Sequence, residues 1–580
     1  MIKKTIIRRP QLNSPDIDND LHPVLNRVYQ ARGVSSPEQL DYSLAKLLPF
    51  NSLSNIERAT ELLVLALEQQ KRIVIVADYD ADGATACALG IRGLKMMGAL
   101  DVHFIVPDRF IHGYGLSPEI VELAHELKPD LIITVDNGIS SVEGVALARA
   151  KEIDVLVTDH HLPGPVLPEA NVIVKPNLDN DAFQSKALAG VGVMFYVLAA
   201  LRAGLREQNW FEDKNIPQPQ LAQLLDLVAL GTVADVVQLD LNNRIFVAQG
   251  LERIRRGHCG AGIQALFAVA GKPLEKISSS DLGFAIGPRL NAAGRLDDMR
   301  LGIECLLCDD ATSALQMATQ LDQLNKERRE IQSEMEEEAL LAIESVNLDV
   351  EVSLPYGICL YQDNWHQGVV GIVASKIKEK THRPVIAFAK ESEELLKGSA
   401  RSIRDIHIRD AIEAIASAHP GVISKFGGHA MAAGLSLRQD KFEEFCKYFD
   451  QEIERQIKIK GFDSELLSDG ELAENEFSLE LAEKFKQAGP WGQGFPEPQF
   501  DGKFNILESR IVGGKHLKLK LYISDKKDAL DAIAFNHTDE QWPRGVTQVS
   551  ALYRLNINDY RGRRTPQLIV EHIEPISSEL

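Results

Sequence analysis

Short apolar runs alternate with longer stretches of helical periodicity between residues 60 and 240. The runs are RIVIVAD, VHFIVPD, LIITVDNG, DVLVTDHH and NVIVKPN, and they begin roughly 20 to 30 residues apart, as βαβ units require. Because each run is apolar throughout, it is typical of a parallel strand covered by helices on both faces. We therefore predict a doubly wound α/β domain, whose ligand site should lie beyond the carboxyl ends of the strands.

The rest of the chain changes pattern three times. Residues 311–345 contain no Gly or Pro and place apolar residues at helical spacing, which predicts one long connecting helix. Residues 346–460 again mix strands with helices and carry the Gly-rich turns GSARS and FGGHAMAAG, which indicates a second, smaller α/β domain. From residue 461 to residue 580 short strands are broken by turn signals, which indicates a small β-barrel of the oligonucleotide-binding (OB) kind.

Together these patterns predict a multidomain α/β protein, and 580 residues are enough for several separate cores. We expect an N-terminal segment packed on the core at 1–60, a parallel-sheet domain at 61–310, the connecting helix at 311–345, the smaller α/β domain at 346–460 and the barrel at 461–580.

Charge, cysteine content and hydropathy limit the surroundings of the protein. Asp and Glu number 83 against 63 Lys and Arg, and the net charge of −20 argues against bulk coating of nucleic acid but allows a local basic channel. The six cysteines show no disulfide-framework spacing. No apolar run reaches the ~18 residues that span a bilayer, and the start, MIKKTIIRRP, lacks the apolar core of a secretory signal. We expect a cytoplasmic protein.

The stretch VADYDADG places three carboxylates directly after the first apolar run. In an extended segment alternate side chains share a side, so Asp78, Asp80 and Asp82 can converge before Gly83 turns the chain into a helix. The N-terminus of that helix offers only about half a positive charge. One or two divalent cations would compensate the three anions, although Asp-rich turns are also common on surfaces without a metal.

Further along the chain, three segments carry similar groups. Asp136 closes LIITV, Asp159, His160 and His161 close DVLV, and Asp235 lies in the apolar stretch GTVADVV, where an unpaired charge would be costly. Oxygen-rich ligands with one or two imidazoles suit Mn²⁺ or Mg²⁺ better than structural zinc. The set is large enough for two ions, and a pair of ions predicts phosphoester hydrolysis.

The motifs DYDADG, VDNG, TDHH and GTVAD, in this order and spacing, resemble those of the DHH phosphoesterase superfamily. Nearly the whole chain is similar to the bacterial single-stranded-DNA exonucleases within that superfamily. GPRLNAAGR resembles the end of their core domain, HQGVVGIVASK, GSARS and FGGHAMAAG resemble their DHHA1 domain, and GPWGQGFPEPQF resembles the start of their terminal barrel.

The resemblance implies a role for each residue of the acidic cluster. One metal would be held by Asp78 and Asp80 and the other by Asp82, His160 and Asp235, with Asp136 between the two. His161 would contact the scissile phosphate, and Asp159 would orient a histidine. Many members of the superfamily carry a histidine earlier in the first motif, where this chain has the apolar Val76. The first metal should therefore be less fully coordinated.

Residues outside the cluster are candidates for binding the substrate. Arg289, Asn291 and Arg295 would contact phosphates near the cleaved end, although a capped turn with solvated arginines is a competing interpretation. The resemblance assigns further phosphate contacts to Arg401, Gly427, Gly428 and His429. Tyr114 could stack on a base or pack in the core. Lys518 and Arg561 lie among tyrosines of the barrel, which fits either a single-strand groove or a solvated face.

We therefore predict an exonuclease specific for single-stranded DNA that works 5′→3′ and releases 5′-mononucleotides, with the direction implied by the resemblance alone. DNA repair and recombination are the implied processes, with a single-strand-binding protein and a RecQ-type helicase as expected partners. The alternative enzyme is a DHH-type phosphodiesterase for short oligonucleotides or cyclic dinucleotides, which would lack the terminal barrel. A DNA-binding replication protein on a degenerate DHH domain would have lost metal residues that this chain retains.

Overall fold

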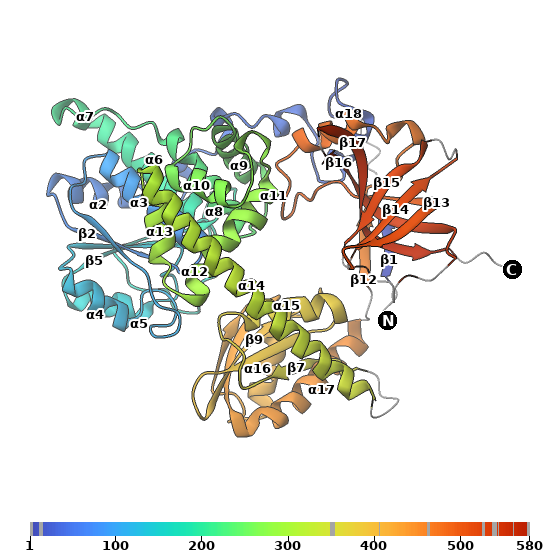
Figure 1. Cartoon of the computed structure of the whole chain (residues 1–580). Coiled ribbons are helices and arrows are strands. Elements are labelled where there is room, and N and C mark those ends of the chain that lie inside the picture. The colour runs from blue at the N-terminus through green and yellow to red at the C-terminus, as the bar shows by residue number, and fades with distance from the viewer. Residues whose placement is uncertain are drawn as a thin grey trace. The chain divides into compact units, whose positions relative to one another are not determined.

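A computed structural model describes residues 4–10, 16–348, 354–404, 406–460, 464–514, 516–524, 528–535, 537, 542, 545–560 and 562–576 (Figure 1). The chain forms two compact units. The smaller unit is built mainly from residues 323–465, and the larger mainly from residues 6–294 and 466–580. Among the helices in these ranges, none is both long and apolar enough to cross a membrane.

A five-stranded parallel sheet organises the larger unit (Figure 1). Its order is β3-β2-β4-β5-β6, with β2 (Ile73–Ala77), β3 (Val102–Ile105), β4 (Leu131–Val135), β5 (Asp154–Thr158) and β6 (Val172–Val174). Helices α4 (Pro118–Glu126) and α5 (Val142–Ala150) pack on the face that presents Val74 and Val76. Helices α3 (Ala81–Met96) and α6 (Gly190–Glu207) lie on the other face, against Ile75. The predicted doubly wound domain is confirmed.

The order of the strands reverses between β2 and β4. From β2 the chain passes to its neighbour β3 and then returns to β4 on the opposite side of β2. At such a reversal the loops that follow the two strands diverge and leave a crevice at the carboxyl ends, where ligands of doubly wound folds bind. The motifs DYDADG and VDNG follow these two strands and therefore border the crevice.

The remaining helices of the larger unit surround this sheet or flank the barrel. They are α1 (Pro23–Gln30), α2 (Ile56–Glu68), α7 (Trp210–Asp213), α8 (Leu225–Ala234), α9 (Leu241–Arg255), α10 (Ala261–Val269), α11 (Ser279–Asp281), α12 (Gly287–Leu296), α13 (Arg300–Leu307) and α18 (Leu479–Gln487). A π-helix spans Leu282–Ile286 between α11 and α12. Helix α14 (Ala311–Leu348) runs without a break, as the spacing of its apolar residues predicts.

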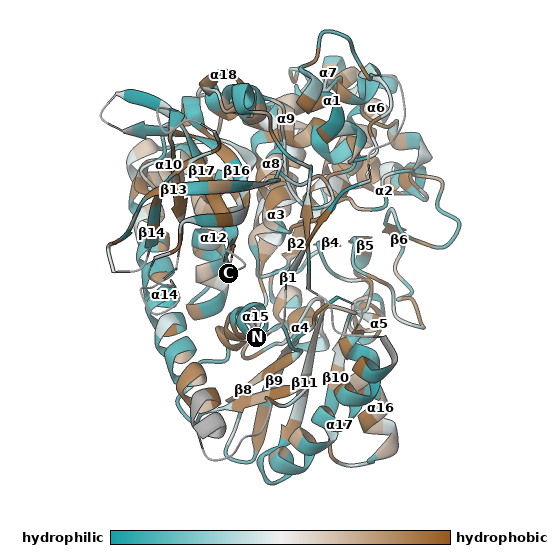
Figure 2. Ribbon diagram, turned by 90° about the vertical axis from the view of Figure 1, so that its right-hand side faces the viewer, coloured by the Kyte–Doolittle hydropathy of each residue, from teal (hydrophilic) through white to brown (hydrophobic). Residues whose placement is uncertain are grey.

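The smaller unit has a mixed sheet of order β10-β11-β9-β8-β7. Its elements are β7 (Ile358–Tyr361), α15 (Val370–Thr381), β8 (Val385–Lys390), β9 (Leu395–Arg401), α16 (Ile408–Ala418), β10 (Lys425–Gly428), β11 (Ala432–Arg438) and α17 (Phe442–Lys460). Phe388, Phe445 and Phe449 lie at the centre of its core. Strand β8, which is apolar over most of its length, is brown in Figure 2. The predicted second α/β domain is confirmed.

The C-terminal part of the larger unit is a five-stranded barrel of order β13-β14-β15-β17-β16. Its strands are β13 (Phe500–Val512), β14 (His516–Tyr522), β15 (Leu530–Ala534), β16 (Gln548–Tyr560) and β17 (Arg563–Pro575). Because β13 also pairs with β16, every strand of the ring has two partners. A separate two-stranded sheet joins β1 (Lys4–Arg8) to β12 (Ser464–Ser468). The predicted barrel is confirmed.

Candidate metal centre

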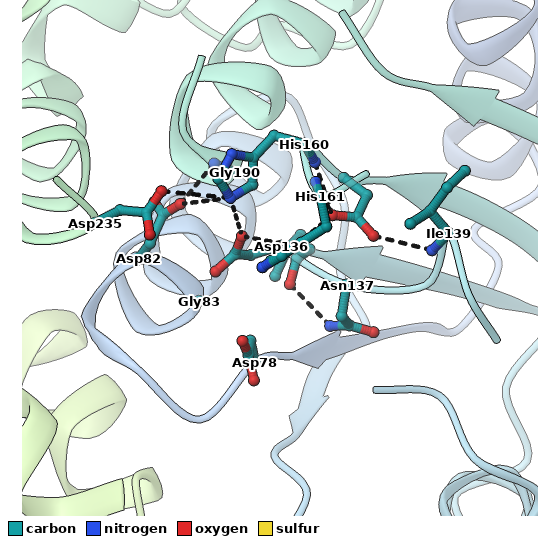
Figure 3. A network of polar contacts seen from close by, with 12 residues as sticks. Asp78, Asp82, Gly83, Asp136, Asn137, Ile139, His160, His161, Gly190 and Asp235 are labelled. Carbon is teal, nitrogen blue, oxygen red and sulfur yellow. Dashed lines mark hydrogen bonds and ion pairs between the residues drawn. The ribbon is translucent and has the colours of Figure 1, made fainter. Parts of the chain in front are cut away.

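The acidic and histidine residues gather at the crevice between β2 and β4 (Figure 3). Asp78 follows β2, Asp82 lies in the first turn of α3, and Asp136 follows β4. His160 comes from the loop after β5, and Asp235 ends helix α8. Four segments that are distant in the sequence thus contribute side chains to one cluster.

The ligand atoms form overlapping groups whose members all lie within 4.8 Å of one another. The groups are Asp78, Asp80 and Asp136; Asp82, His160 and Asp235; and Asp136, His160 and His161. The structure thus brings together the residues expected from the sequence around each of two metals. Asp136 joins the first two groups, because its Oδ1 lies 3.0 Å from Nε2 of His160.

Two helix N-termini hold carboxylates of the cluster in place. Asp80 is the N-cap of α3, and its Oδ1 accepts hydrogen bonds from the backbone N–H of Asp82 at 2.9 Å and of Gly83 at 3.1 Å. Asp82 accepts hydrogen bonds from the N–H of Gly190 at 2.6 Å and of Val191 at 3.0 Å, at the start of α6. The partial positive charge of a helix N-terminus stabilises such anions. It is too small to compensate the whole cluster.

Glycines make room for these carboxylates. A Cβ atom added at Gly190 would lie 2.5 Å from Cβ of Asp136, and one at Gly231 would lie 2.7 Å from Oδ1 of Asp82. A Cβ at Gly83 would lie 2.4 Å from the carbonyl oxygen of Asp78. Real Cβ atoms do not approach neighbours so closely, so a side chain at any of these positions would displace the cluster.

Three carboxylates of the cluster are almost fully buried and the other members are partly buried, and burial changes their acidity. Asp82 and Asp136 are each 1% exposed. Burial, and then repulsion between the aspartates, raises the pKa of Asp82 to about 7 and holds the pKa values of Asp136 and Asp235 well above their usual range. Burial, and then the nearby His161, lowers the pKa of His160 to about 4, so its ring is neutral at pH 7.

Three buried polar atoms of the cluster make no hydrogen bond with any described residue: Oδ1 of Asp136, Nε2 of His160 and Oδ2 of Asp235. His160 Nε2 lies 3.4 Å from Asp235 Oδ2, but neither this contact nor the one with Asp136 has hydrogen-bond geometry. Buried polar atoms normally have a partner. Carboxylate oxygens and a neutral imidazole are ligands that suit Mn²⁺ or Mg²⁺. The residues therefore fit divalent cations.

Asp159 and His161 form a pair beside the metal ligands. Oδ1 of Asp159 accepts hydrogen bonds from the N–H of His160 and His161, at 2.7 and 3.0 Å, and lies 2.8 Å from Nδ1 of His161. Burial alone would raise the pKa of Asp159, but the hydrogen bond and charge of His161 outweigh it and lower that pKa. Burial also opposes a charge on His161, yet Asp159 raises its pKa. His161 can therefore carry a proton at the site.

Tyr114 borders the same pair. Its hydroxyl donates a hydrogen bond to the carbonyl oxygen of Asp136 at 3.2 Å and lies 3.2 Å from Nδ1 of His161. The Tyr79 ring meets the Tyr114 ring edge-on at 6.0 Å, and the guanidinium of Arg109 lies over Tyr79 at 4.2 Å. The Tyr114 side chain is thus held at its hydroxyl end while 44% of the residue stays exposed.

The sequence reasoning missed three polar residues that hold the site together. Asn137 is fully buried, and its Nδ2 donates to the carbonyl oxygens of Val76 and Val135, which ties β2 to β4 at the crevice. Lys175 is also buried and donates to the carbonyl oxygen of His161 and to Asn177. Asn177 in turn donates to the carbonyl oxygen of His160 at 2.8 Å. The available signal was a polar residue directly after an apolar run, in VDN and in VKPN.

Within the larger unit, two of the other residues predicted to bind the substrate contact protein residues instead. Oδ1 of Asn291 accepts a hydrogen bond from the N–H of Ala81 at 2.8 Å, which anchors the acidic loop. Arg289 forms a salt bridge with Asp322 at 2.8 Å. Lys518 is half-buried on β14, where buried residues alternate with it. Arg561 lies outside the described residues.

In the smaller unit, the predicted residues cluster at one end of the sheet. Arg401 at the end of β9 pairs with Ala432, and Gly428 at the end of β10 pairs with Ala433. Gly428 has a φ of +139°, which a side chain would strain, and a Cβ at Gly427 would meet nothing within 4 Å. The backbone N–H of His429 donates to Ala432 at 2.7 Å. Arg295 donates to the carbonyl oxygen of Gly368 at 3.1 Å.

Comparison with known proteins assigns the chain to a family. Family models match residues 72–232 ("DHH family, N-terminal domain"), 354–455 ("DHHA1 domain") and 468–572 ("RecJ OB domain"). The chain is 51% identical over 573 residues to the single-stranded-DNA-specific exonuclease RecJ of Dickeya dadantii (strain 3937), and the match covers 99% of each chain. The chain belongs to the RecJ family.

Solved structures of RecJ share the fold. RecJ from Thermus thermophilus in complex with Mn²⁺ matches 96% of this chain and 77% of that chain, with a TM-score of 0.79 and 30% identity. RecJ from the same organism in complex with Mg²⁺ matches 96% of this chain and 76% of that chain, with a TM-score of 0.73 and 29% identity. The carboxylate and imidazole groups of this RecJ-family chain suit both of these ions.

Substitution of Gly190 tests whether the packing around Asp136 sets metal affinity. Gly190→Ala should weaken Mn²⁺ binding by about 10- to 100-fold, because the added methyl group must displace Asp136. Isothermal titration calorimetry with Mn²⁺ alone measures this effect. Gly192→Ala is the matched control, since its Cβ would meet only the flexible Leu188 side chain at 3.3 Å. Equal affinities of the two variants would contradict the prediction.

The raised pKa values predict that metal stabilises the protein more at higher pH. In the metal-free protein the pKa of Asp82 is about 7, against roughly 4 in an unfolded chain. Native stability is therefore lost as pH rises through that interval. Metal binding needs deprotonated ligands and removes their repulsion.

We expect the rise in melting temperature caused by saturating Mn²⁺ to be larger at pH 8 than at pH 6, in calorimetry of chelator-treated protein. Asp82→Asn should flatten this dependence. A Mn²⁺ effect of the same size at both pH values would refute the assignment of these carboxylates as ligands.

Proposed function

We propose that this chain is a single-stranded-DNA-specific exonuclease that hydrolyses phosphodiester bonds with two Mn²⁺ or Mg²⁺ ions. The observation that carries the proposal is the pair of ligand groups linked by Asp136, in a chain that matches curated RecJ exonucleases along nearly its whole length. Paired ions polarise the phosphodiester, activate a water molecule as nucleophile and stabilise the leaving oxygen when bound.

The chain's own residues have separate tasks in this reaction. Asp78, Asp80 and Asp136 would hold one ion, and Asp82, His160 and Asp235 the other. His161 would keep a proton on its ring, because Asp159 favours its charged form, and would donate a hydrogen bond to an oxygen of the scissile phosphate. Lys175 and Asn177 fix the backbone of both histidines and so orient their rings.

We also propose the direction, products, biological role and partners that the resemblance to RecJ implies. Digestion would run 5′→3′ and release 5′-mononucleotides in DNA repair and recombination, in the cytoplasm, with a single-strand-binding protein and a RecQ-type helicase as partners. The domain limits expected from the sequence belong to this proposal: residues 61–310 would carry catalysis, and residues 346–460 and 461–580 would bind DNA. Arg401 and the turn at Gly427, Gly428 and His429 would contact phosphates.

The rival enzyme, a phosphodiesterase for short oligonucleotides or cyclic dinucleotides, is not favoured. The chain has a five-stranded C-terminal barrel that the RecJ OB domain matches at residues 468–572, and such a barrel serves long single strands. A non-enzymatic DNA-binding protein is disfavoured as well, because carboxylates and histidines that could hold metal ions come together at the crevice.

Digestion of an end-labelled single strand tests the proposal. With Mn²⁺ or Mg²⁺ the wild-type chain should release a 5′ label first and leave a duplex of the same sequence intact. Asp136→Ala should lower the rate at least about 100-fold, because it removes the residue that links the two ligand groups. Asp213→Ala, which removes an exposed carboxylate on α7, is the control. Release from the 3′ end first, or full activity of Asp136→Ala, would overturn the proposal.

A further inference from the structure

A cavity of about 800 Å³ lies in the larger unit, between the end of α8, the π-helix, α18 and the barrel strands β16 and β17. Its wall includes Trp491 and Gln493 of the motif GPWGQGFPEPQF. The proposed catalytic reaction does not involve this motif. The volume is that of a site for a small ligand or for one or two nucleotides of a longer chain. We call it the barrel-side pocket.

The lining of the barrel-side pocket includes the residue that follows a metal-ligand candidate in the chain. Val236, which follows the metal-ligand candidate Asp235, lines the pocket and is 63% exposed. Its φ of +61° is a backbone conformation that β-branched residues rarely adopt. The chain thus presents an apolar side chain to solvent at the position next to a metal ligand. A strand whose phosphate lies at Asp235 must continue past this residue.

An exposed aromatic ring stands on the same wall. Phe284 lies in the π-helix Leu282–Ile286 and is 80% exposed. No described residue stacks on its ring, although many other aromatic rings of the chain have such partners. π-Helical turns are rare and occur frequently at functional sites. A free ring face on a pocket wall is a platform on which a nucleobase can stack.

Cations also line the barrel-side pocket. Lys276, Arg554 and Arg564 each form a salt bridge with a carboxylate, with Asp559 at 3.1 Å, Glu497 at 2.6 Å and Glu483 at 2.7 Å. Lys486 makes no salt bridge with any residue that the structure describes. Burial lowers its pKa, the carboxylate of Asp281 raises it, and the charges of Arg255, Lys276 and Arg564 lower it further. Because the other three cations are paired with carboxylates, Lys486 is the cation of this pocket that is most available to an added anion. An anion bound at Lys486 would relieve the repulsion.

We propose that the barrel-side pocket is a subsite for an unstacked nucleotide of the single-stranded substrate, with Phe284 stacking on the base and Lys486 binding a phosphate. The proposal rests on the proposed function and extends it, since it names the residues that would hold the strand between the metal centre and the barrel. An acidic peptide would also match the positive charge. The continuity with Asp235 favours DNA, because only the substrate must occupy both places at once.

A binding experiment that needs no catalysis tests this subsite. In the full-length chain carrying Asp136→Ala, with Mn²⁺ present, fluorescence anisotropy measures the affinity for a labelled 20-nucleotide strand. Adding Phe284→Ala should weaken binding about tenfold, whereas Phe284→Tyr should restore most of the affinity. Lys486→Gln should weaken binding and reduce its dependence on salt concentration. The matched controls Leu100→Ala, which removes another apolar side chain of 80% exposure, and Lys484→Gln, which removes the neighbouring paired lysine of α18, should change nothing.

Position-specific fluorescence identifies the occupant. Strands with 2-aminopurine placed at successive positions from the 5′ end should show quenching at one or two adjacent positions, and Phe284→Ala should abolish it. Unchanged DNA affinity of Phe284→Ala, or quenching that does not depend on Phe284, would overturn the proposal and leave an acidic peptide as the occupant to examine. Because this experiment measures binding by a chain in which Asp136→Ala slows cleavage, the outcome is independent of the end-label digestion of the wild-type chain. Binding without digestion would refute only the proposed function.

Discussion

Mutual repulsion among buried carboxylates is the constraint on which the rest of this structure depends. Asp78, Asp82 and Asp136 are all nearly inaccessible to water, and burial and repulsion together hold their pKa values far above the usual range. A protein has no structural reason to concentrate like charges where water cannot screen them. Two divalent cations would offset both the burial of the carboxylates and the repulsion between them, because every carboxylate would then face opposite charge. The raised pKa values are therefore the mark of a site built for a charge that the chain itself does not contain.

The fold supplies what such a site requires before any metal arrives. A parallel sheet whose order reverses between β2 and β4 brings two acidic loops to the same crevice. Two helices, α3 and α6, direct their N-termini at Asp80 and Asp82 and supply backbone donors. Gly190 allows α6 to approach Asp136 closely enough for this. Rigid elements therefore hold the ligands, and the backbone provides part of the compensating charge.

Much of this could be predicted from the sequence, because it depends on local order. Periodicity identifies the strands, the right-handed βαβ rule makes them parallel, and their carboxyl ends share an edge, so Asp78, Asp136 and His160 had to lie close together. Asp235 could be assigned only by its charge in an apolar stretch and by resemblance. What could not be predicted are contacts between segments with no fixed spacing. The salt bridge of Arg289 with Asp322 and the hydrogen bonds of Asn137 are of this kind.

The metal centre accounts for hydrolysis but not for the choice of substrate. Carboxylates and imidazole act on the phosphodiester group, which single strands, duplexes and small cyclic nucleotides all contain. Selection must come from residues that sense what the phosphodiester is attached to. A duplex buries its base faces, whereas a single strand can offer them to a ring such as Phe284. Because the remaining surface is strongly acidic, the few cations beside that ring would matter more than their number suggests. Catalysis and selection would thus be carried by adjacent parts of one unit that meet at Asp235 and Val236.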